Sequence, residues 1–425
     1  MGSENKIDRR TFLKSSAGAA AGLAVFGQLG FSRKSFAQAK DSVKIGIVLP
    51  LTGPFSTEAQ YMVEGATVAM EEFNAKGGVL GRKVELVIRD DKLKPDEAAR
   101  RTKELLEKGD ISFLCGGLGA HVQVAINSQA KEGKTIFMCI GSGNEINQWP
   151  DVSPYTFHEA LNPYISSHTV APWVTKNLGK KWFFLVADYS FGWQVTEALR
   201  KIGKDLAMID AGEIKHPVGA TDYFPYFPKI LAAEPEVLMM DNFGKDQLNS
   251  IKQAHAFGLK RKMKIVVPVL AVSARLGAGD EAFEGVYGGA SFWWTLENTI
   301  PTAKKFVSAY RQKWGRPPTD YAGYGYGGIM ELMNAVGRAG STDTQKVILA
   351  LEKREYDNYK GKQWWVPWSH QSMQDNYILR SKSAKEKKDE WDLFEVVTAI
   401  KASENMDRTW QELGLKSNEP LSNLF

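Results

Sequence analysis

The feature that most constrains the fold is a regular alternation of apolar runs and helical patterns, which begins with the run 43–49. Continuous apolar runs of this length are typical of parallel strands that are buried on both faces. In the next segment Met62, Ala66 and Phe73 recur at helical spacing and would form one apolar face. Because the same order of elements starts again after Tyr155, the sequence predicts an α/β protein with two doubly wound, parallel-sheet lobes.

The alternation continues through most of the chain. Apolar runs that are typical of strands lie at 84–91, 111–115, 135–140, 181–190, 236–243 and 263–269. Patterns that are typical of helices lie at 95–108, 120–132, 163–177, 191–204, 245–258, 302–314 and 323–339. The tail from 340 to 425 is mixed and less periodic, so it is interpreted only coarsely.

The first 39 residues are typical of an export signal. The stretch "DRRTFLK" holds the pair Arg9 and Arg10, a weakly apolar run follows at 17–31, and "AQA" at 37–39 supplies small residues for a signal peptidase. This is the twin-arginine pattern. A membrane anchor is the alternative, but the apolar run is shorter than the roughly 20 residues that a spanning helix needs. We therefore expect a cleaved signal and a periplasmic location.

Charge and cysteine content exclude several classes of function. Residues 1–39 hold six of the Lys and Arg side chains and two of the acidic ones, which leaves 48 basic and 47 acidic residues in the rest of the chain. This even balance indicates no basic surface for nucleic acid. Two cysteines, Cys115 and Cys139, cannot form a disulfide framework. One bridge is conceivable after export, but twin-arginine cargo folds in a reducing cytosol, so two buried free thiols are expected.

One stretch of about 50 residues carries a combination of motifs that is typical of a known family. The matching residues are Pro50, Thr52-Gly53-Pro54, Gly65-Ala66, Asn74, Gly77-Gly78, Leu80-Gly81-Arg82 and Asp90-Asp91. With them the chain resembles the type I solute-binding proteins of the leucine/isoleucine/valine-binding protein family. The resemblance continues through "FGWQVTEALRKIGK" and "YAGYGYGGIMELMNAVGRAG" and becomes weaker after residue 340.

The resemblance implies two lobes joined by three crossover strands, with a small-molecule solute bound in the cleft between them. We expect lobe 1 at 43–158 plus 290–340, lobe 2 at 159–289 plus 341–400, and a tail at 401–425. Such proteins deliver their solute to an ABC permease in the inner membrane. The resemblance further implies a monomer without a cofactor. Ligands of open parallel sheets bind outside the carboxyl ends of the strands, and hinge closure around a ligand is a known motion.

By this resemblance, three loops of the first lobe are expected to contact the solute. The candidate residues are Phe55, Glu58, Leu118, Gly119, Ala120, Ser142, Gly143 and Asn144. Amino-acid binders of the family usually place Ser or Thr in the glycine loop to bind a carboxylate, whereas this chain has no hydroxyl at 116–120. Backbone N–H groups would have to bind the carboxylate in place of these hydroxyl groups. Glu58 would favour a cationic or donor group of the solute, or would only complement the helix dipole.

The second lobe offers candidates that are mostly aromatic. They are Tyr189, Phe191, Trp193, Asp241, Phe243 and Leu270, and a further candidate, Trp293, comes just after a predicted crossover. Asp241 is expected to be able to hold an ammonium group. Amino-acid binders often have an acid at the end of the next strand, but Val269 and Leu270 stand there, which weakens the case for an α-amino acid. The tryptophans would suit an apolar or aromatic solute, or would simply pack in the core.

No catalytic or nucleotide-binding motif is present in the sequence. The glycine loop at 115–121 follows the third strand and lacks the spacing of a dinucleotide fingerprint. No metal-ligand spacing of histidines and no nucleophile-elbow motif occurs. We therefore expect a binding protein and no enzyme, with an amino acid or amide-like solute, or alternatively an aromatic or aliphatic carboxylate. An exported sensor that reports to a membrane kinase is a different reading of the same features.

Overall fold

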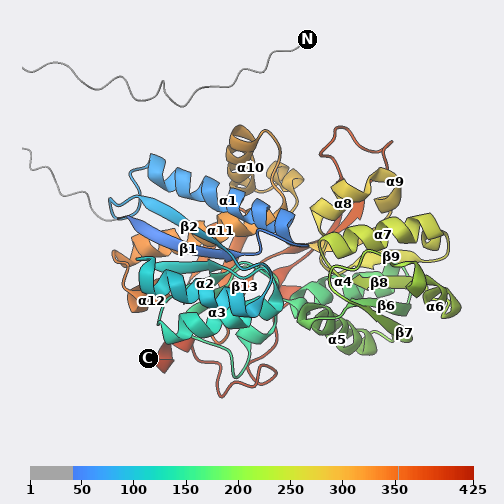
Figure 1. The fold of residues 1–425 in the computed structure, drawn as a ribbon, viewed down its shortest axis with the longest axis horizontal. Helices are drawn as coiled ribbons and strands as arrows, with labels where there is room; N and C mark the ends of the chain where they lie inside the picture. Colours follow the sequence, from blue (N-terminus) through green and yellow to red (C-terminus); the bar gives the residue numbers. More distant parts are fainter. Residues whose placement is uncertain (1–41, 353) are drawn as a thin grey trace, which may run out of the picture. The chain divides into compact units, whose positions relative to one another are not determined.

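A computed structural model describes residues 42–352 and 354–425, and its first sheet is parallel throughout (Figure 1). The predicted export signal at 1–39 lies outside the described residues. The strand order is β2-β1-β3-β4-β5. The bounds are β1 Val43–Leu49, β2 Val84–Asp90, β3 Phe113–Gly116, β4 Phe137–Cys139 and β5 Thr156–His158. All their pairings are parallel, as the continuous apolar runs predicted.

The second sheet has the order β15-β14-β10-β9-β8-β6-β7. Its strands are β6 Lys181–Ala187, β7 Ile209–His216, β8 Val237–Asp241, β9 Lys264–Val267, β10 Tyr287–Ala290, β14 Asn376–Ser381 and β15 Phe394–Ile400. The strands from β6 to β10 pair in parallel, whereas β14 and β15 add an antiparallel edge. A third sheet is small and consists of β11 Glu355–Asn358, β12 Gly361–Trp365 and β13 Ser372–Met373.

The helices divide between the two large sheets, and we call each sheet with its helices a lobe (Figure 1). The first lobe has α1 Ser56–Ala75, α2 Pro95–Lys108, α3 Ala120–Glu132, α10 Pro301–Trp314, α11 Asp320–Ala339 and α12 Thr344–Glu352. The second has α4 Pro163–Asn177, α5 Ser190–Asp205, α6 Phe227–Ala232, α7 Lys245–Phe257, α8 Val272–Ala278 and α9 Asp280–Phe283. The chain passes between the lobes after β5, after β10 and before β14, which agrees with three crossovers.

The predicted residue boundaries of the lobes stay a prediction, because the residues from 41 to 425 form one contact unit. In the segment 341–400, β14 and β15 join the second sheet. Helix α12, which belongs to the same segment, packs instead against α11 of the first lobe.

The glycines of "GYGYGG" at 323–328 serve helix packing. A Cβ on Gly325 would lie 1.9 Å from the backbone oxygen of Met62 in α1, and one on Gly65 would lie 1.8 Å from the oxygen of Ala322. Helices α1 and α11 therefore touch backbone to backbone. The other glycines have different neighbours, since a Cβ on Gly323 or Gly327 would meet the ring of Tyr359 and one on Gly328 would meet Ile140.

We expect Gly325→Ala to lower the free energy of unfolding by roughly 1–3 kcal/mol, because the added methyl group overpacks this contact. Chemical denaturation measures the effect. Gly337 is the matched control, since it lies on the same helix and a Cβ there meets nothing within 4 Å. Gly337→Ala should not destabilise the chain, because alanine has the higher helix propensity. Equal stability of the two variants would contradict the packing account.

Both cysteines are free and buried, which confirms the expected thiols. They lie on neighbouring strands, but Cys115 packs in the large core cluster and Cys139 in a separate cluster around α2 and α3. Successive residues of a strand face opposite sides of the sheet, and the pairing sets Cys115 beside Met138. The two sulfur atoms therefore belong to opposite faces of the sheet.

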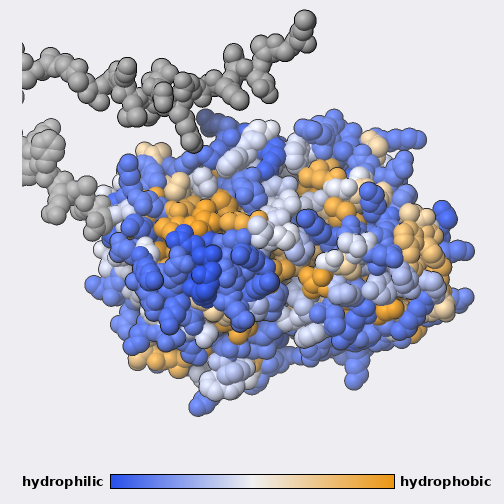
Figure 2. All heavy atoms as spheres, in the orientation of Figure 1, coloured by the Kyte–Doolittle hydropathy of each residue, from blue (hydrophilic) through white to orange (hydrophobic). Residues whose placement is uncertain are grey.

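Within the described ranges, no helix combines the length and the apolar character that a membrane crossing requires. On the face drawn in Figure 2, hydrophilic residues predominate and the apolar ones form separate patches.

Candidate ligand-binding site

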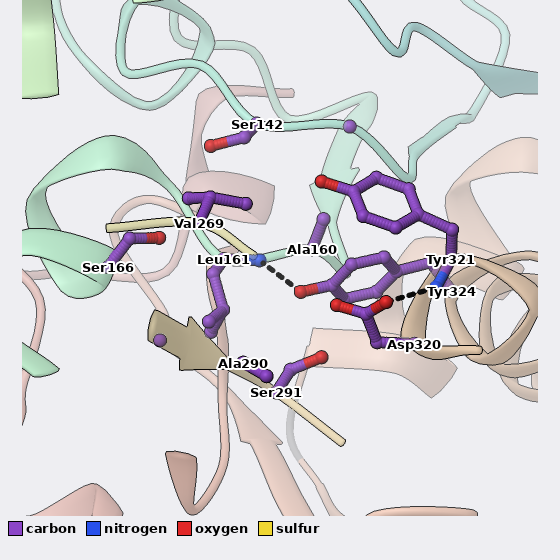
Figure 3. Close-up of a pocket in the computed structure, with 12 residues that line it drawn as sticks. Ser142, Ala160, Leu161, Ser166, Val269, Ala290, Ser291, Asp320, Tyr321 and Tyr324 are labelled. Atoms are coloured by element: carbon purple, nitrogen blue, oxygen red, sulfur yellow. Dashed lines mark hydrogen bonds between the residues drawn. The ribbon is translucent and has the colours of Figure 1, made fainter. Parts of the chain in front are cut away.

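A small cavity lies where the two lobes meet, at the carboxyl ends of β4 and β10 and the start of α11 (Figure 3). Its lining residues are Gly141, Ser142, Ala160, Leu161, Ser166, Val269, Gly289, Ala290, Ser291, Asp320, Tyr321 and Tyr324. The space open to the centre of a water molecule is about 10 Å³, which is room for about one water. The structure is therefore a closed arrangement, and a solute can enter only if the walls move apart.

The glycine loop after β3 brings three strand ends close together. Gly116 has a φ of +133°, and a Cβ there would lie 2.0 Å from the oxygen of Val48. A Cβ on Gly141 would lie 2.1 Å from the oxygen of Gly117. These glycines are needed because backbone meets backbone at the ends of β1, β3 and β4. The loop is thus a structural support of the cavity wall that contains Gly141.

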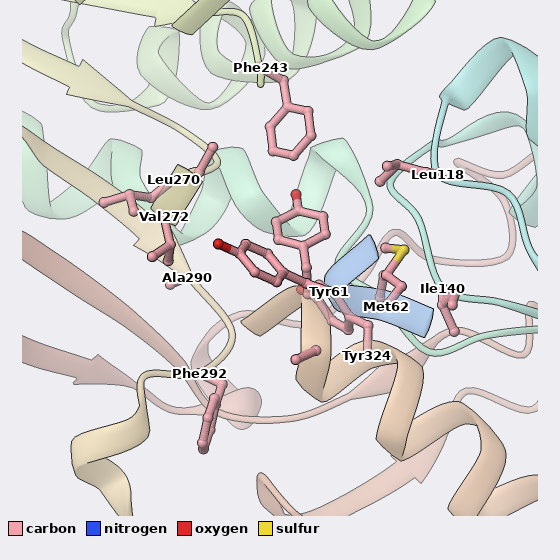
Figure 4. Packing of buried hydrophobic residues seen from close by; sticks show 14 of the residues in the cluster. Tyr61, Met62, Leu118, Ile140, Phe243, Leu270, Val272, Ala290, Phe292 and Tyr324 are labelled. Atoms are coloured by element: carbon pink, nitrogen blue, oxygen red, sulfur yellow. The ribbon is translucent and has the colours of Figure 1, made fainter. Parts of the chain in front are cut away.

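A cluster of aromatic rings joins the two lobes. We use the name aromatic cluster for Phe55, Tyr189, Phe191, Phe243 and Tyr321. The ring centroids of Phe55 and Phe243 are 5.2 Å apart, and those of Phe243 and Tyr321 are 5.1 Å apart. Because Phe55 and Tyr321 come from the first lobe and Phe243 from the second, the cluster spans the interface. Figure 4 shows Phe243, Leu270 and Leu118 approaching the same space from different elements.

Two buried carboxyl groups lie in this region. Glu58 on α1 is 1% exposed and accepts a hydrogen bond from the hydroxyl of Ser273 on α8, in the other lobe. Burial raises the pKa of Glu58 to about 7, against the smaller lowering effects of Ser273 and Lys245. Asp320 is 3% exposed and lines the cavity, and burial raises its pKa to about 8. The charge of Glu58 adds to that shift.

A buried ion pair lies next to the cavity at the first crossover. Lys360 Nζ is 2.9 Å from Glu159 Oε1, and both side chains are fully buried. The ammonium group of Lys360 also lies 5.1 Å from the ring centroid of Tyr324, which lines the cavity. Tyr356 and Gln363 donate further hydrogen bonds to the carboxylate of Glu159. The charge of Lys360 is thus already balanced within the protein.

Several predicted contacts lie beside the cavity. Ser142 lines it directly, and Leu270 follows the lining residue Val269. Leu118 and Ala120 are buried in the core next to the glycine loop, Gly119 precedes α3, and a Cβ on Gly143 would lie 2.3 Å from Gln123 Oε1. Phe55, Tyr189, Phe191 and Phe243 come together in the aromatic cluster. Contact with a solute stays a prediction for each of these residues.

Three further candidates, Asp241, Trp193 and Trp293, do not line the cavity. Asp241 Oδ2 accepts a hydrogen bond of 2.6 Å from the hydroxyl of Thr196 on α5, while Oδ1 is buried and makes no hydrogen bond within the described residues. Trp193 is 48% exposed, and its ring nitrogen donates to Asp188. Trp293 packs edge-on against Phe394 at 5.0 Å. Contact with a solute stays a prediction for these three residues as well.

Asn144 is engaged in holding the chain together. Its side-chain oxygen accepts a hydrogen bond of 3.2 Å from Arg408 Nη2, and its backbone N–H donates to Gln194 Oε1 at 2.8 Å. These bonds tie the loop after β4 to the tail and to α5.

Sequence reasoning missed Asp320, Tyr321 and Tyr324. The available signal was Thr319, whose hydroxyl accepts a hydrogen bond from the N–H of Ala322 and caps α11. This cap fixes the helix start, and the first turn of the helix then carries an acid and two tyrosines into the cavity. The helix predicted at 323–339 includes Tyr324 but leaves out Asp320 and Tyr321, where α11 begins.

Comparisons with known proteins agree with this geometry. A family model described as a periplasmic binding protein matches residues 42–387. A curated relative from Brucella abortus, called Leu/Ile/Val-binding protein homolog 7, is 23% identical over 339 residues, which cover 74% of this chain and 82% of the relative. A second family model, for the twin-arginine signal sequence, matches residues 6–26 and confirms the predicted signal.

Two solved structures show the same fold. A periplasmic binding protein from Burkholderia mallei has a TM-score of 0.80 and 28% identity, and the match covers 86% of this chain and 96% of that one. A solute-binding protein of an ABC transporter from Rhodopseudomonas palustris, solved with 3,4-dihydroxybenzoic acid, has a TM-score of 0.75 and 22% identity. That match covers 85% of this chain and 98% of the other.

Proposed function

The chain belongs to the periplasmic binding protein family, and we propose on this premise that it captures one small solute between its lobes and hands it to an ABC permease of the inner membrane. The twin-arginine signal and the family together place the mature chain in the periplasm. We propose further that it acts as a monomer and binds its solute without turning it over.

The observation that carries the proposal is the cavity between the lobes. Residues of both lobes line it, and it lies at the carboxyl ends of parallel strands, where open α/β sheets bind ligands. Hydrogen bonds and ring contacts such as Glu58–Ser273 and Phe55–Phe243 join the lobes around it. A solute bound there would be enclosed by the closing lobes, which is what capture and release require.

The solute that we propose first is an amino acid or an amide-like compound. Glu58 and Asp320 support this choice, because carboxylates accept hydrogen bonds from ammonium and amide groups. An aromatic carboxylate is the second candidate. The aromatic cluster supports it, and the Rhodopseudomonas palustris protein was solved with an aromatic acid.

A thermal-shift screen of residues 40–425 tests the proposal. The panel contains amino acids, short amides and aromatic acids. A solute that binds only the folded chain adds about 2.7 kcal/mol of stability at a hundredfold excess over its dissociation constant. At least one class should raise the melting temperature. A folded chain that responds to none of these classes would contradict the proposed function.

We expect Phe243→Ala to weaken binding of the screen's strongest solute by roughly 1–3 kcal/mol, because it removes an aromatic wall shared by both lobes. Isothermal calorimetry gives the dissociation constant. The matched control is Phe224→Ala, whose side chain is 44% exposed and packs against Phe227 and Phe257 away from the cavity. An unchanged dissociation constant for Phe243→Ala would remove the cluster from the site.

Transport and sensing differ in the downstream partner. A permease gene beside the gene of this chain would support transport, whereas a receptor-kinase gene would support sensing. Reconstitution with that permease is the direct check, since a transport subunit should stimulate ATP hydrolysis only when its solute is present.

A further inference from the structure

The cavity region holds more buried carboxyl groups than buried basic groups. Among the described residues, the basic side chains whose charges reach Glu58 or Asp320 are Lys245 and Lys360. Lys245 is exposed to solvent, which screens its charge. Lys360 is already paired with Glu159. The other titratable groups around Glu58 and Asp320 are neutral tyrosine hydroxyls, those of Tyr61, Tyr321, Tyr324 and Tyr359. Two buried carboxyls thus lack a buried cation of their own.

Buried hydroxyl groups in the same cavity also lack partners. Ser291 is fully buried, and its Oγ makes no hydrogen bond within the described part of the chain, although the hydroxyls of Tyr324 and Tyr359 lie beside it. Figure 3 shows this oxygen on the side of the cavity where Asp320 lies. Ser142 Oγ lines the cavity and is likewise unpaired in the described residues. A buried polar atom without a partner is costly, which points to a ligand that carries a polar group.

The aromatic cluster adds a third element. Phe55 and Tyr321 belong to the same helix starts as the two carboxyls, since Phe55 precedes α1 by one residue and Tyr321 follows Asp320, and the ring of Phe243 packs against both rings. The faces of aromatic rings attract cations, and guanidinium and ammonium groups are bound in this way.

We infer that the captured solute carries a positively charged nitrogen, an ammonium or an amidinium group, which binds between Glu58 and Asp320 against the aromatic cluster. This inference rests on the proposed function and narrows it to cationic solutes. It assigns the charge recognition to α1 and α11 of the first lobe, and gives Asp241 of the second lobe no part in it.

The inference has a consequence for pH. In the empty closed form, burial raises the pKa of Glu58 to about 7 and that of Asp320 to about 8, so both are partly protonated near neutrality. A cation favours the ionised forms, lowers both pKa values and releases protons when it binds. Its affinity should therefore rise from about pH 6 to about pH 8. A bound carboxylate would favour the protonated forms, and its affinity should fall over the same range.

Matched solutes of different charge test the inference by isothermal calorimetry. The probes are benzamidinium, benzamide and benzoate, which share one shape, and leucine against 4-methylpentanoate, which lacks the ammonium group. The cationic member of each set that binds should do so roughly tenfold to a hundredfold more tightly, as expected for hydrogen bonds to charged groups. Repeating the titration in buffers of different ionisation enthalpy should reveal proton release.

Variants locate the charge recognition. Glu58→Gln and Asp320→Asn should each weaken the cationic probe roughly tenfold or more and reduce the proton release. The control Asp96→Asn changes an exposed acid at the start of α2 and should change neither quantity. The pH dependence of binding is measured on the unmodified chain, so it still tests the inference if a variant fails to fold.

The outcomes separate the inference from the proposed function. The inference is wrong if benzamide, benzoate or 4-methylpentanoate binds as tightly as its cationic counterpart, or if affinity falls as pH rises. It is also wrong if the strongest solute of the thermal-shift screen carries no cationic nitrogen. In these cases capture of a solute still stands. If the folded chain binds no solute of the screen and none of these probes, the proposed function itself fails.

Discussion

Replacing Lys360 by methionine should lower the free energy of unfolding by about 3–5 kcal/mol. The substitution leaves the carboxylate of Glu159 fully buried without its cation, and breaking one side of a buried pair typically costs this much. Tyr356 and Gln363 still donate to that carboxylate and keep the loss at this level. Chemical denaturation of residues 40–425 gives the value.

Two further variants show whether that loss of stability comes from the unpaired charge of Glu159. Adding Glu159→Gln to Lys360→Met should recover part of the stability, because the uncompensated charge is then gone. Lys401→Ala is the matched control, since Lys401 is 62% exposed and its pair with Asp375 lies at the surface. That change should cost less than about 1 kcal/mol. A loss for Lys360→Met that is no larger than the control's would show that the crossover pair does not hold the fold together.

Gly116→Ala should cost about 2–6 kcal/mol, which sums the strain of a positive φ and the clash with the backbone of Val48. Gly77→Ala separates the two contributions, because Gly77 has a φ of +93° and a Cβ there meets nothing within 4 Å. Only the strain should appear at Gly77. Equal losses at both positions, measured by denaturation, would contradict the close approach of β1 and β3.

The order of the elements could be predicted because each one carries its own local signal. Helices at 95–108, 120–132 and 163–177 begin and end where the sequence indicated, since prolines or glycines mark their ends. Strand β7 was missed because it forms the edge of its sheet and is partly exposed, so it has no continuous apolar run. Strands β14 and β15 were missed because β14 pairs with β10, which is far away in the sequence, and β15 pairs only with β14 at the edge of the sheet.

The site was predictable only where it follows strand ends. Phe55, Ser142 and Phe243 follow β1, β4 and β8, and the topology alone brings them to one edge. Asp241 stays a predicted ammonium ligand, and its Oδ2 accepts a hydrogen bond from Thr196 on α5, a contact that no local pattern indicates. The role of Asp320 depends on how α11 packs against α1, which only the folded chain shows.

The central claim is that one small solute binds in the cavity between the lobes. A calorimetric titration of residues 40–425 with the strongest solute of the thermal-shift screen tests it most directly. We expect one solute per chain and a dissociation constant that rises when Phe243 is replaced by alanine. A stoichiometry other than one, or affinity that is indifferent to Phe243, Glu58 and Asp320 together, would place binding elsewhere and contradict the account.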